Sequence, residues 1–438
     1  MCEFFNTIGA LESFFWAYIG FLLVVLAGLY FTIKSGFYQF RVLMNLKKTI
    51  RDLIDDAKGE VTGHNPIKIY FASVSGMIGL GNIVAIVTAV LVGGPGSIFW
   101  LWIAAFCGMI IKYCEVYLGM KFRVPNKKGG YDGGSMVYLP HAFKSEWAKK
   151  LVFGLICTLI CIYGVEVYQF VVITDTLSQT FKWNKDLVVF ALLAMTLYVG
   201  IGGMKRLANV ATILGPIFIT LYVVMCVTVV VIYSHELPAI FMMIFKSAFV
   251  GQAPLGGFVG STFMLAAQQG TARAVYSADI GIGYDSIIQS ETRAKTPEKQ
   301  ARMMIFGAFA DVLFCTLSLL VILATGVWLT PEKILTSQYV AKGLGMVFPY
   351  VDYYMAFFIF MAGWTTIMAY FTVGLKVSKL LSRRFGKLLY VAYASYAFYF
   401  FSFYDQTKVL VIMSLCGGLL ISVNLFGIIR LRHHIKFR

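Results

Sequence analysis

The fold of this chain is decided by the stretch Ser73-Val74-Ser75-Gly76-Met77-Ile78-Gly79-Leu80-Gly81-Asn82, in the middle of a long apolar run. Each glycine costs a helix roughly 1 kcal/mol relative to alanine, and here three of them lie where lipid makes a regular helix most necessary. One interpretation is a helix that packs closely against a neighbour through small residues. The other is a helix interrupted at mid-membrane, whose free backbone groups bind a ligand or ion.

The composition of the chain indicates a polytopic membrane protein. Its 438 residues are 59% hydrophobic and only 13% charged, and apolar runs of about 20 residues recur along the sequence, which is the length that crosses a bilayer. A soluble enzyme is therefore excluded. The eight cysteines fall mostly inside these runs without a CxxC pair, so we expect reduced, packed thiols. The N-terminus has no basic segment before its first apolar run, which argues against a cleaved signal peptide.

The apolar runs predict eleven transmembrane helices, the seventh of them unusually long. They centre on Phe14–Ile33, Ile67–Val92, Ser97–Met120, Lys150–Ile173, Leu187–Gly202, Asn209–Tyr233, Pro238–Tyr276, Met303–Trp328, Tyr350–Lys376, Leu388–Phe403 and Val409–Ile429.

The basic residues predict the orientation of the chain. With the N-terminus outside and the C-terminus in the cytoplasm, 29 of the 37 lysines and arginines fall in cytoplasmic segments, as the positive-inside rule requires. The net charge of +16 is therefore a consequence of membrane insertion and does not point to nucleic acid. We expect an integral protein of the plasma membrane, the inner membrane in a bacterium.

Eleven spans suggest an internal symmetry. If residues 1–65 are a peripheral helix and its cytoplasmic linker, two five-helix units remain, 66–233 and 238–430, followed by a basic tail, 431–438. The two units enter the membrane from opposite sides, which is the arrangement of an inverted repeat.

An inverted repeat of this kind predicts a second helix break in the matching helix. The run Gly251-Gln252-Ala253-Pro254-Leu255-Gly256-Gly257-Phe258-Val259-Gly260 contains four glycines and a proline between two apolar segments, and such a run stops a helix. We expect the second break there. The alternative is two helices joined by an outer loop.

Ionisable residues inside the spans are costly and usually paired or functional. The i,i+3 spacing of Lys112 and Glu115 predicts a structural ion pair. Glu166 and Asp311 are isolated carboxylates that either face a polar pathway or bond a neighbouring helix. Asp279 and Asp285 follow Arg273 near the expected cytoplasmic edge, where we expect an inner-gate network.

Catalytic and nucleotide-binding patterns are missing from the sequence. The five histidines lie in loops or in the tail, which leaves no membrane-embedded triad or histidine metal site. The glycine-rich loop 127–134 lacks the GK[ST] ending of a phosphate-binding loop. We therefore expect ion-coupled movement or passive conduction, and no cofactor other than a coupling cation.

Several short motifs follow one another along the chain: Gly76–Ile83, Gly93–Gly96 with Phe99-Trp100, Lys112–Glu115, Lys121–Arg123, Gly256–Gly260, Gly270–Arg273 continuing to Gly283, and Phe309–Asp311. Together they resemble the alanine or glycine:cation symporter family. The resemblance implies a leucine-transporter-type fold of the amino acid/polyamine/organocation superfamily, with five-plus-five inverted repeats behind one peripheral helix. It also implies uptake of a small amino acid, driven by sodium or protons.

The chain departs from the family pattern at Met77, Leu80, Val171, Ala278, Asp279 and Tyr370. The first two stand where the family has threonines, Val171 replaces an asparagine, Ala278-Asp279 replaces asparagine-glutamate, and Tyr370 replaces a tryptophan. The loss of hydroxyls beside the first break leaves the identity of the amino acid open.

Two broken helices suit an amino-acid zwitterion. Half-helix N-termini offer N–H groups to its carboxylate, unwound carbonyls accept from its ammonium, and glycine lets it approach the backbone closely. The resemblance adds Gln169 and Tyr370 as the sides of this cradle. The expected substrate-binding residues are Gly76, Met77, Gly79, Leu80, Gly81, Gln169, Gly256, Gly257, Phe258 and Tyr370.

A desolvated sodium ion takes about five or six hard oxygen ligands. The resemblance implies hydroxyls from Thr365 and Thr366 and carbonyls from the stretch 75–78, although threonines in membrane helices also bond their own backbone. The expected cation ligands are Ser75, Ile78, Asn82, Thr365 and Thr366, and the expected gate or coupling residues are Glu166, Arg273, Asp279 and Asp311.

Three alternatives remain open from the sequence. Proton coupling through Glu166 competes with sodium coupling. A channel would need polar rings along a continuous pore, and a membrane-embedded enzyme would need Glu166, Asp279 and Asp311 at one depth. Neither the stoichiometry nor the oligomeric state follows from the sequence, although a monomer suffices for this architecture.

Overall fold

The computed structural model describes residues 2–57, 63–126, 130–202, 219–253, 255, 260–330 and 334–437. This part of the chain is helical apart from one small hairpin of β1 (Val124–Pro125) and β2 (Tyr131–Asp132) and two isolated bridges. The predicted all-α class is confirmed.

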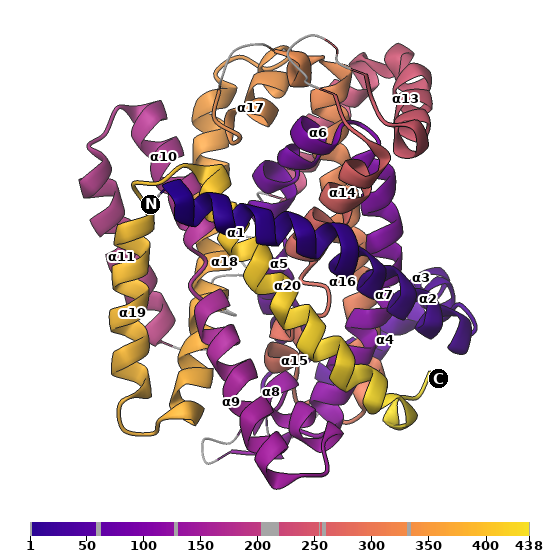
Figure 1. Cartoon of the computed structure of the whole chain (residues 1–438), viewed down its shortest axis with the longest axis vertical. Coiled ribbons are helices and arrows are strands. Elements are labelled where there is room, and N and C mark those ends of the chain that lie inside the picture. The colour runs from indigo at the N-terminus through magenta and orange to yellow at the C-terminus, as the bar shows by residue number, and fades with distance from the viewer. Residues whose placement is uncertain are drawn as a thin grey trace.

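The first transmembrane segment is one long helix with a π-helical turn inside it. It consists of α1 (Cys2–Phe14), the π turn η1 (Phe15–Gly20) and α2 (Phe21–Lys34). Figure 1 shows α1 crossing the face of the bundle beside α20 (Gln406–Arg430), and α1 and α20 are in contact. Two shorter helices, α3 (Tyr38–Met44) and α4 (Leu46–Ala57), follow.

The next helices form the first half of the bundle. They are α5 (Pro66–Met77), η2 (Gly81–Ala85), α6 (Val87–Gly93), α7 (Ser97–Lys121), α8 (Ser135–Tyr138), η3 (Leu139–Ala142), α9 (Glu146–Tyr163), α10 (Val167–Phe181) and α11 (Lys185–Ile201).

The second half begins with the helix Ile219–Ile232. It continues with η4 (Ser234–Glu236), α13 (Leu237–Val250), α14 (Phe263–Ala278), α15 (Tyr284–Gln289), α16 (Pro297–Ala324), η5 (Val327–Leu329), α17 (Gln338–Gly345), α18 (Val351–Leu381), α19 (Gly386–Phe401), α20 and η6 (Arg432–His434).

Helix α7 is the central element of the bundle. It packs against α2, α14 and α16, and nearly all of its second half is buried. The approach of α14 is so close that a Cβ added at Gly270 would lie 2.2 Å from the carbonyl oxygen of Ser97. Small residues bring membrane helices together in this way, and here they place α14 beside the centre of the molecule.

Within the described residues, seven helices are long and apolar enough to cross a membrane, and the bent pair Ile219–Ile232 with Ser234–Val250 would make eight. These helices confirm a protein with several membrane spans, but they do not confirm the predicted number of eleven. Helices α11, α14 and α19 have 17, 16 and 16 residues, which is shorter than the roughly 20 residues of a full straight span.

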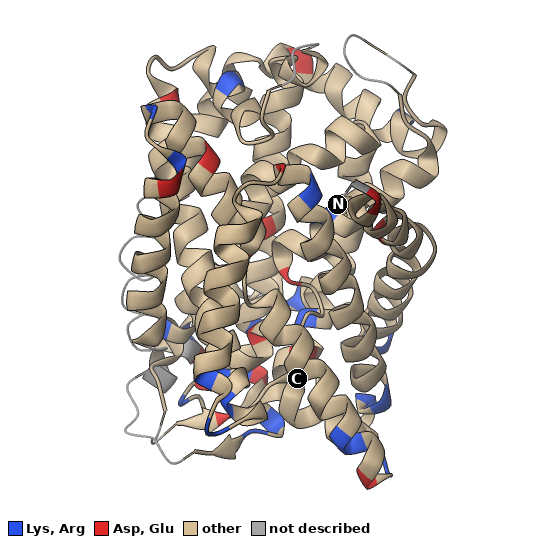
Figure 2. Cartoon of the chain, turned by 60° about the vertical axis from the view of Figure 1, so that its left-hand side comes forward, with Lys and Arg blue, Asp and Glu red and all other residues tan. Residues whose placement is uncertain are grey.

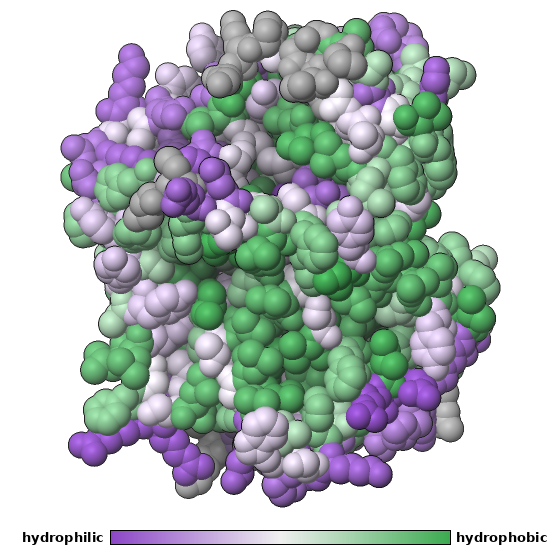
Figure 3. All heavy atoms as spheres, viewed as in Figure 1, coloured by the Kyte–Doolittle hydropathy of each residue, from purple (hydrophilic) through white to green (hydrophobic). Residues whose placement is uncertain are grey.

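Basic and apolar side chains lie at different levels along the long axis of the molecule. Lysines and arginines gather at the lower end in Figure 2, and Figure 3 shows hydrophobic side chains covering the middle of the same molecule. Large exposed apolar side chains on α2, α11 and α19 include Leu26, Leu187 and Leu388. An apolar belt above a basic end is the surface expected of a protein that spans a bilayer.

Candidate functional site

The first helix break lies where the sequence predicts it. Helix α5 starts at Pro66, where the side chain of Asn65 accepts hydrogen bonds from the first free N–H groups. It ends at Met77 because Ile78 is extended (ψ 90°), and η2 begins only at Gly81. The interruption therefore comprises residues 78–80, here called break 1. A contact with a residue no more than three positions from a break is described below as a contact with that break.

Amide side chains meet the backbone that break 1 sets free. The N–H of Gly79 donates to Oδ1 of Asn82 (3.1 Å), and the N–H of Leu80 donates to Oε1 of Gln169 on α10 (3.2 Å). A Cβ added at Gly79 would lie 2.9 Å from the same Gln169 oxygen. Backbone N–H groups of this kind, at the start of a half-helix, are suited to a carboxylate.

A second helix break lies next to break 1. It comprises residues 279–283, between α14 and α15, and is here called break 2. Asp279, Gly281 and Gly283 all have positive φ there, a conformation that glycine adopts without strain. A Cβ added at Gly81 would lie 3.0 Å from the Cα of Ser277. The two breaks therefore face each other at backbone contact distance.

The predicted second break at 251–260 needs correction. Helix α13 does end at Val250, but Gln252 and Ser261 exchange backbone hydrogen bonds of 2.9 and 2.8 Å as an antiparallel bridge, and α14 follows. Helix α13 ends at this run and α14 begins after it, which agrees with the alternative of two helices joined by a loop. Gly256, Gly257 and Phe258 lie outside the described residues.

Only one of the two predicted threonines faces break 1. Thr366 Oγ1 on α18 donates to the carbonyl oxygens of Ser75 (3.2 Å) and Ala362 (3.1 Å), whereas Thr365 Oγ1 donates to Ala362 alone (2.9 Å). A Cβ added at Gly79 would lie 2.3 Å from Thr366 Oγ1. The Ser75 carbonyl and the Thr366 hydroxyl are therefore neighbouring hard oxygens beside break 1.

A buried carboxylate joins both breaks to α16. Asp311 accepts hydrogen bonds from Asn82 Nδ2 (2.5 Å) and Ser277 Oγ (2.9 Å), and all three residues are at most 2% exposed. The side chains that contact Asp311 belong to Asn82, Ser277 and Cys315, so no described basic side chain pairs with this carboxylate. A carboxylate, an amide and a hydroxyl together are the hard donor set that an alkali cation prefers.

The described residues include no group of three or more His, Cys, Asp or Glu side chains placed to hold a metal ion. A cation between the breaks would therefore rely on amide, hydroxyl and backbone oxygens around the single Asp311 carboxylate. That donor set suits a weakly bound, exchangeable ion more than a resident transition metal.

The Tyr370 side chain on α18 contacts break 2. Its hydroxyl donates to Asp279, and its ring stacks on Tyr284 with centroids 4.0 Å apart and an interplanar angle of 11°. Tyr284 in turn lies against break 1, since a Cβ added at Gly76 would lie 2.7 Å from its hydroxyl oxygen. The two stacked tyrosines thus wall the space between α5, α15 and α18.

Glu166 lies just before α10 and is 1% exposed. Its two carboxylate oxygens accept the hydroxyl of Tyr276 on α14 at distances of 3.2 and 3.0 Å. Glu166 is therefore bonded to the helix that ends at break 2.

The structure does not bring Arg273 together with Asp279 and Asp285, so the predicted inner-gate network of these residues is wrong. Arg273 Nη2 lies 3.7 Å from Glu12 of α1, whose carboxylate also accepts Ser414 Oγ of α20 at 2.5 Å. The reason is that Asp279 follows the end of α14 and has a positive φ, so its side chain does not continue the helical face on which Arg273 lies.

The predicted ion pair between Lys112 and Glu115 is also wrong, because each of the two residues has another partner. Lys112 forms an ion pair with Asp285 of α15, and Glu115 accepts the N–H of Ser286 at 3.3 Å. Sequence spacing favours partners on the same helix and does not register a short helix that packs across it. Sequence reasoning missed Ser277 and Tyr284 as site residues, although Tyr284 directly follows the turn Gly281-Ile282-Gly283, which signals irregular backbone.

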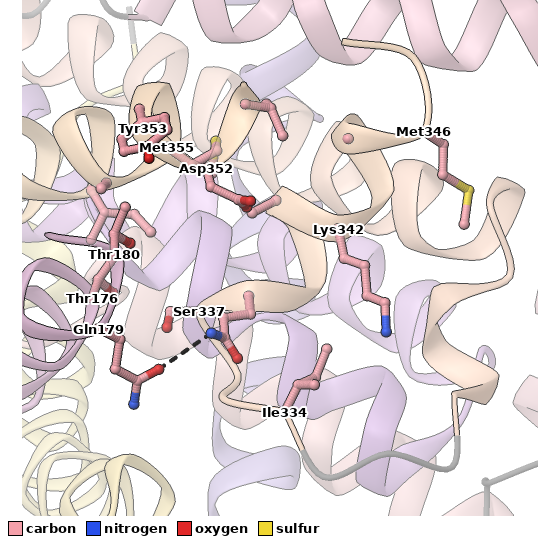
Figure 4. A pocket seen from close by; sticks show the side chains of 16 residues that line it. Thr176, Gln179, Thr180, Ile334, Ser337, Lys342, Met346, Asp352, Tyr353 and Met355 are labelled. Carbon is pink, nitrogen blue, oxygen red and sulfur yellow. Dashed lines mark hydrogen bonds between the residues drawn. The ribbon is translucent and has the colours of Figure 1, made fainter. Parts of the chain in front are cut away.

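A cavity of about 720 Å³ lies between α10, α17 and α18, as Figure 4 shows. Gln338 on α17 donates to Gln179 on α10 across it, at 3.3 Å. Its lining residues include Thr176 and Ile359, which lie about two helical turns from Gln169 and Thr366 along the chain. The cavity is therefore separate from the breaks but lies along the same two helices.

Apolar side chains pack beside break 1, between α10 and α18. A Cβ added at Gly363 on α18 would lie 2.8 Å from the terminal carbons of both Ile173 and Leu80. Both of these side chains are fully buried. Leu80, at a position where a hydroxyl was expected, thus packs with Ile173 against the glycine.

A family model described as the sodium:alanine symporter family matches residues 1–437. An uncharacterized transporter of Haemophilus influenzae is 32% identical over 98% of this chain and 93% of its own length. The sodium/alanine symporter AgcS of Methanococcus maripaludis is 27% identical over 74% of this chain and 71% of its own. The crystal structure of MhsT in complex with L-phenylalanine has a TM-score of 0.52 at 16% identity and covers 84% of this chain and 82% of that one, which is a likeness of fold.

Proposed function

Because this chain belongs to the sodium:alanine symporter family, we propose that it carries a small neutral amino acid, such as alanine or glycine, across the membrane together with sodium at the two facing breaks. The family is one of transporters and not of enzymes. The observation that carries the proposal is the Asn82–Asp311–Ser277 group, in which one buried carboxylate contacts both breaks.

The amino acid is proposed to lie against the backbone of break 1. Its carboxylate accepts from N–H groups near Gly79 and Leu80, and Gln169, which already bonds Leu80, forms one side. Tyr370 and Tyr284 form the other side through their stacked rings. Such a close-packed wall leaves room for a small side chain, in keeping with alanine or glycine.

Two oxygen-rich places are proposed for the cation. One is the Asp311 group, and the other is formed by the Ser75 carbonyl with the Thr366 hydroxyl. Sodium is a hard ion that takes oxygen ligands. Because break 1 contributes to both places, the amino acid and sodium would order the same segment, which is the physical origin of coupled transport.

The proposed topology is one peripheral helix, two inverted five-helix units over 66–233 and 238–430, and eleven spans in all. Break 1 interrupts the first unit, and break 2 interrupts the second. The basic end of the molecule in Figure 2 is proposed to face the cytoplasm, with the N-terminus outside. The membrane proposed is the plasma membrane.

Proton coupling is the second candidate, and Glu166 is the observation that favours it. This buried carboxylate accepts the hydroxyl of Tyr276, and no basic side chain of the described part of the chain forms an ion pair with it. A carboxylate in such surroundings is suited to take up and release a proton.

The function is tested with purified protein in proteoliposomes. A panel of labelled amino acids is offered under an imposed sodium gradient and, separately, under an imposed proton gradient. We expect saturable uptake of alanine or glycine that follows the sodium gradient. Uptake driven only by protons would transfer the coupling role to Glu166, and an absence of uptake for every small amino acid would refute the proposal.

Gly79→Ala is expected to abolish high-affinity substrate binding. The added Cβ would collide with Thr366 and Gln169, at 2.3 and 2.9 Å, and fill the narrowest part of the cradle. The matched control is Gly154→Ala on α9, where an added Cβ meets nothing within 4 Å. Binding is measured by scintillation proximity with labelled alanine, and wild-type affinity in the Gly79 variant would contradict the cradle.

A further inference from the structure

Lys112 is a fully buried lysine at the centre of the bundle. Its ammonium group forms an ion pair with Asp285 and donates to the carbonyl oxygen of Ala278, and its Nζ lies 3.2 Å from the Met77 sulfur. A lysine ammonium has three donors, so each of its N–H groups has one of these three partners.

The three partners belong to three different helix ends. Met77 is the last residue of α5 before break 1, Ala278 is the last residue of α14 before break 2, and Asp285 is in α15 just after break 2. The carbonyl of Ala278 is of the kind that a helix terminus leaves without an intrahelical partner. One side chain on the unbroken helix α7 therefore contacts both breaks at once.

Further polar contacts bind α15 to its neighbours. Ser73 Oγ on α5 donates to Asp285, which links the two broken spans directly. Glu115, one turn beyond Lys112 on α7, accepts from the Ser286 N–H and from Asn424 Nδ2 on α20, both at 3.3 Å. The segment after break 2 is thus held by α5, α7 and α20.

We propose that Lys112 is a positioning residue that makes the two breaks move as one unit, so that binding at one changes affinity at the other. A buried charge that loses its partner is strongly destabilised. A shift of α5 at Met77 or of α14 at Ala278 must therefore take the ammonium and Asp285 with it. This inference rests on the proposed function, because it concerns how sodium and amino acid influence each other.

The quantity that tests it is the coupling factor, the ratio by which saturating alanine lowers the sodium concentration for half-saturation. Linkage requires that sodium change the alanine affinity by the same ratio, so each preparation provides its own internal check. Binding is measured at equilibrium in detergent with labelled alanine and with a sodium titration.

The main variant is Lys112→Met with Asp285→Asn, which removes both charges and leaves neither buried alone. Methionine matches the length of the lysine stem, and asparagine keeps an acceptor for Ser73. We expect this double variant to bind alanine and sodium separately but to lose most of a coupling factor that is typically about 5- to 150-fold, so that the ratio falls towards one.

The matched control is Lys185→Met with Asp175→Asn. This pair also joins a lysine to an aspartate, with Nζ and Oδ1 2.6 Å apart, but it connects α11 to α10 away from both breaks. We expect the wild-type coupling factor. A loss of coupling in the control equal to that in the Lys112 variant would overturn the inference.

Ser73→Ala keeps the test decisive if the double variant does not reach the membrane. It removes one hydroxyl between α5 and Asp285 and leaves the ion pair in place, and we expect a coupling factor about 2- to 5-fold lower. Its control is Ser378→Ala, a buried serine whose hydroxyl bonds only its own helix at Leu375.

The failure of this inference is distinguishable from that of the proposed function. A wild-type protein that binds neither alanine nor sodium would contradict the proposed function and remove the premise of the inference with it. Wild-type coupling that persists unchanged in both the Lys112 variant and Ser73→Ala would overturn the inference alone, because Lys112 would then only fill and neutralise the core.

Discussion

Asp311→Asn is expected to raise the sodium concentration for half-maximal uptake by roughly 10- to 100-fold, which corresponds to the loss of one charge-assisted interaction. Asparagine has nearly the same shape: its oxygen accepts from Asn82 and its NH2 group donates to the Ser277 hydroxyl, so the packing between η2, α14 and α16 is preserved. What disappears is the one carboxylate that contacts both breaks. Uptake is measured as a function of sodium at fixed alanine.

Asp175→Asn is the comparison for Asp311. It also removes a buried carboxylate, one that is paired with Lys185 and Gln406 on neighbouring helices, and should lower stability without changing the sodium dependence. If the two variants shift the sodium dependence equally, Asp311 has no special role for the cation. If neither does, the site lies elsewhere.

Thr366→Val is expected to reduce sodium-dependent uptake by about tenfold or more, since the loss of a buried hydroxyl costs about 1–3 kcal/mol. The hydroxyl donates to the Ser75 carbonyl at break 1, and valine keeps its volume. Thr365→Val is the adjacent comparison and should have the smaller effect, because the Thr365 hydroxyl bonds only Ala362 of its own helix. Folded protein is confirmed by size-exclusion chromatography.

The relative sizes of the two losses of uptake, in Thr366→Val and Thr365→Val, test where the cation binds. Equal losses in the two valine variants would mean that both hydroxyls bind the cation after a rotation of α18. A larger loss for Thr365→Val would contradict the placement of the cation beside Ser75.

Break 1 could be predicted from sequence because its cause is local. Gly79 and Gly81 weaken the helix at that point, and Asn82 supplies a side-chain oxygen for the Gly79 N–H only three residues away. All of the information lies within one stretch, so the interruption is visible without knowledge of any other helix.

Break 2 was misplaced because the stronger local signal lies elsewhere. The glycine- and proline-rich run at 251–260 follows the end of α13, whereas 279–283 contains only two glycines, together with an aspartate and two isoleucines. Its position at the centre depends on α14 packing against α7 at Gly270. That is a tertiary contact, and no local pattern reports it.

The partners of the charged residues were predictable only in part. Asp311 could be predicted as a site residue because an isolated carboxylate in a membrane helix is costly and is usually functional or paired. Its contact with Ser277, and those of Lys112 with Asp285 and of Tyr370 with Asp279, depend on how three helices are rotated relative to one another. Periodicity gives the faces of a helix but not which neighbour each face meets.

The Glu12–Arg273 contact has a consequence for how the protein is made. Glu12 leaves the ribosome within the first helix, whereas its partners Arg273 and Ser414 are synthesised only after most of the chain has been inserted. A carboxylate held in hydrocarbon without a partner is costly, so the nascent first helix is poorly settled in lipid until the second half arrives. The contacts of Glu12 therefore form only after the second half of the chain has been made.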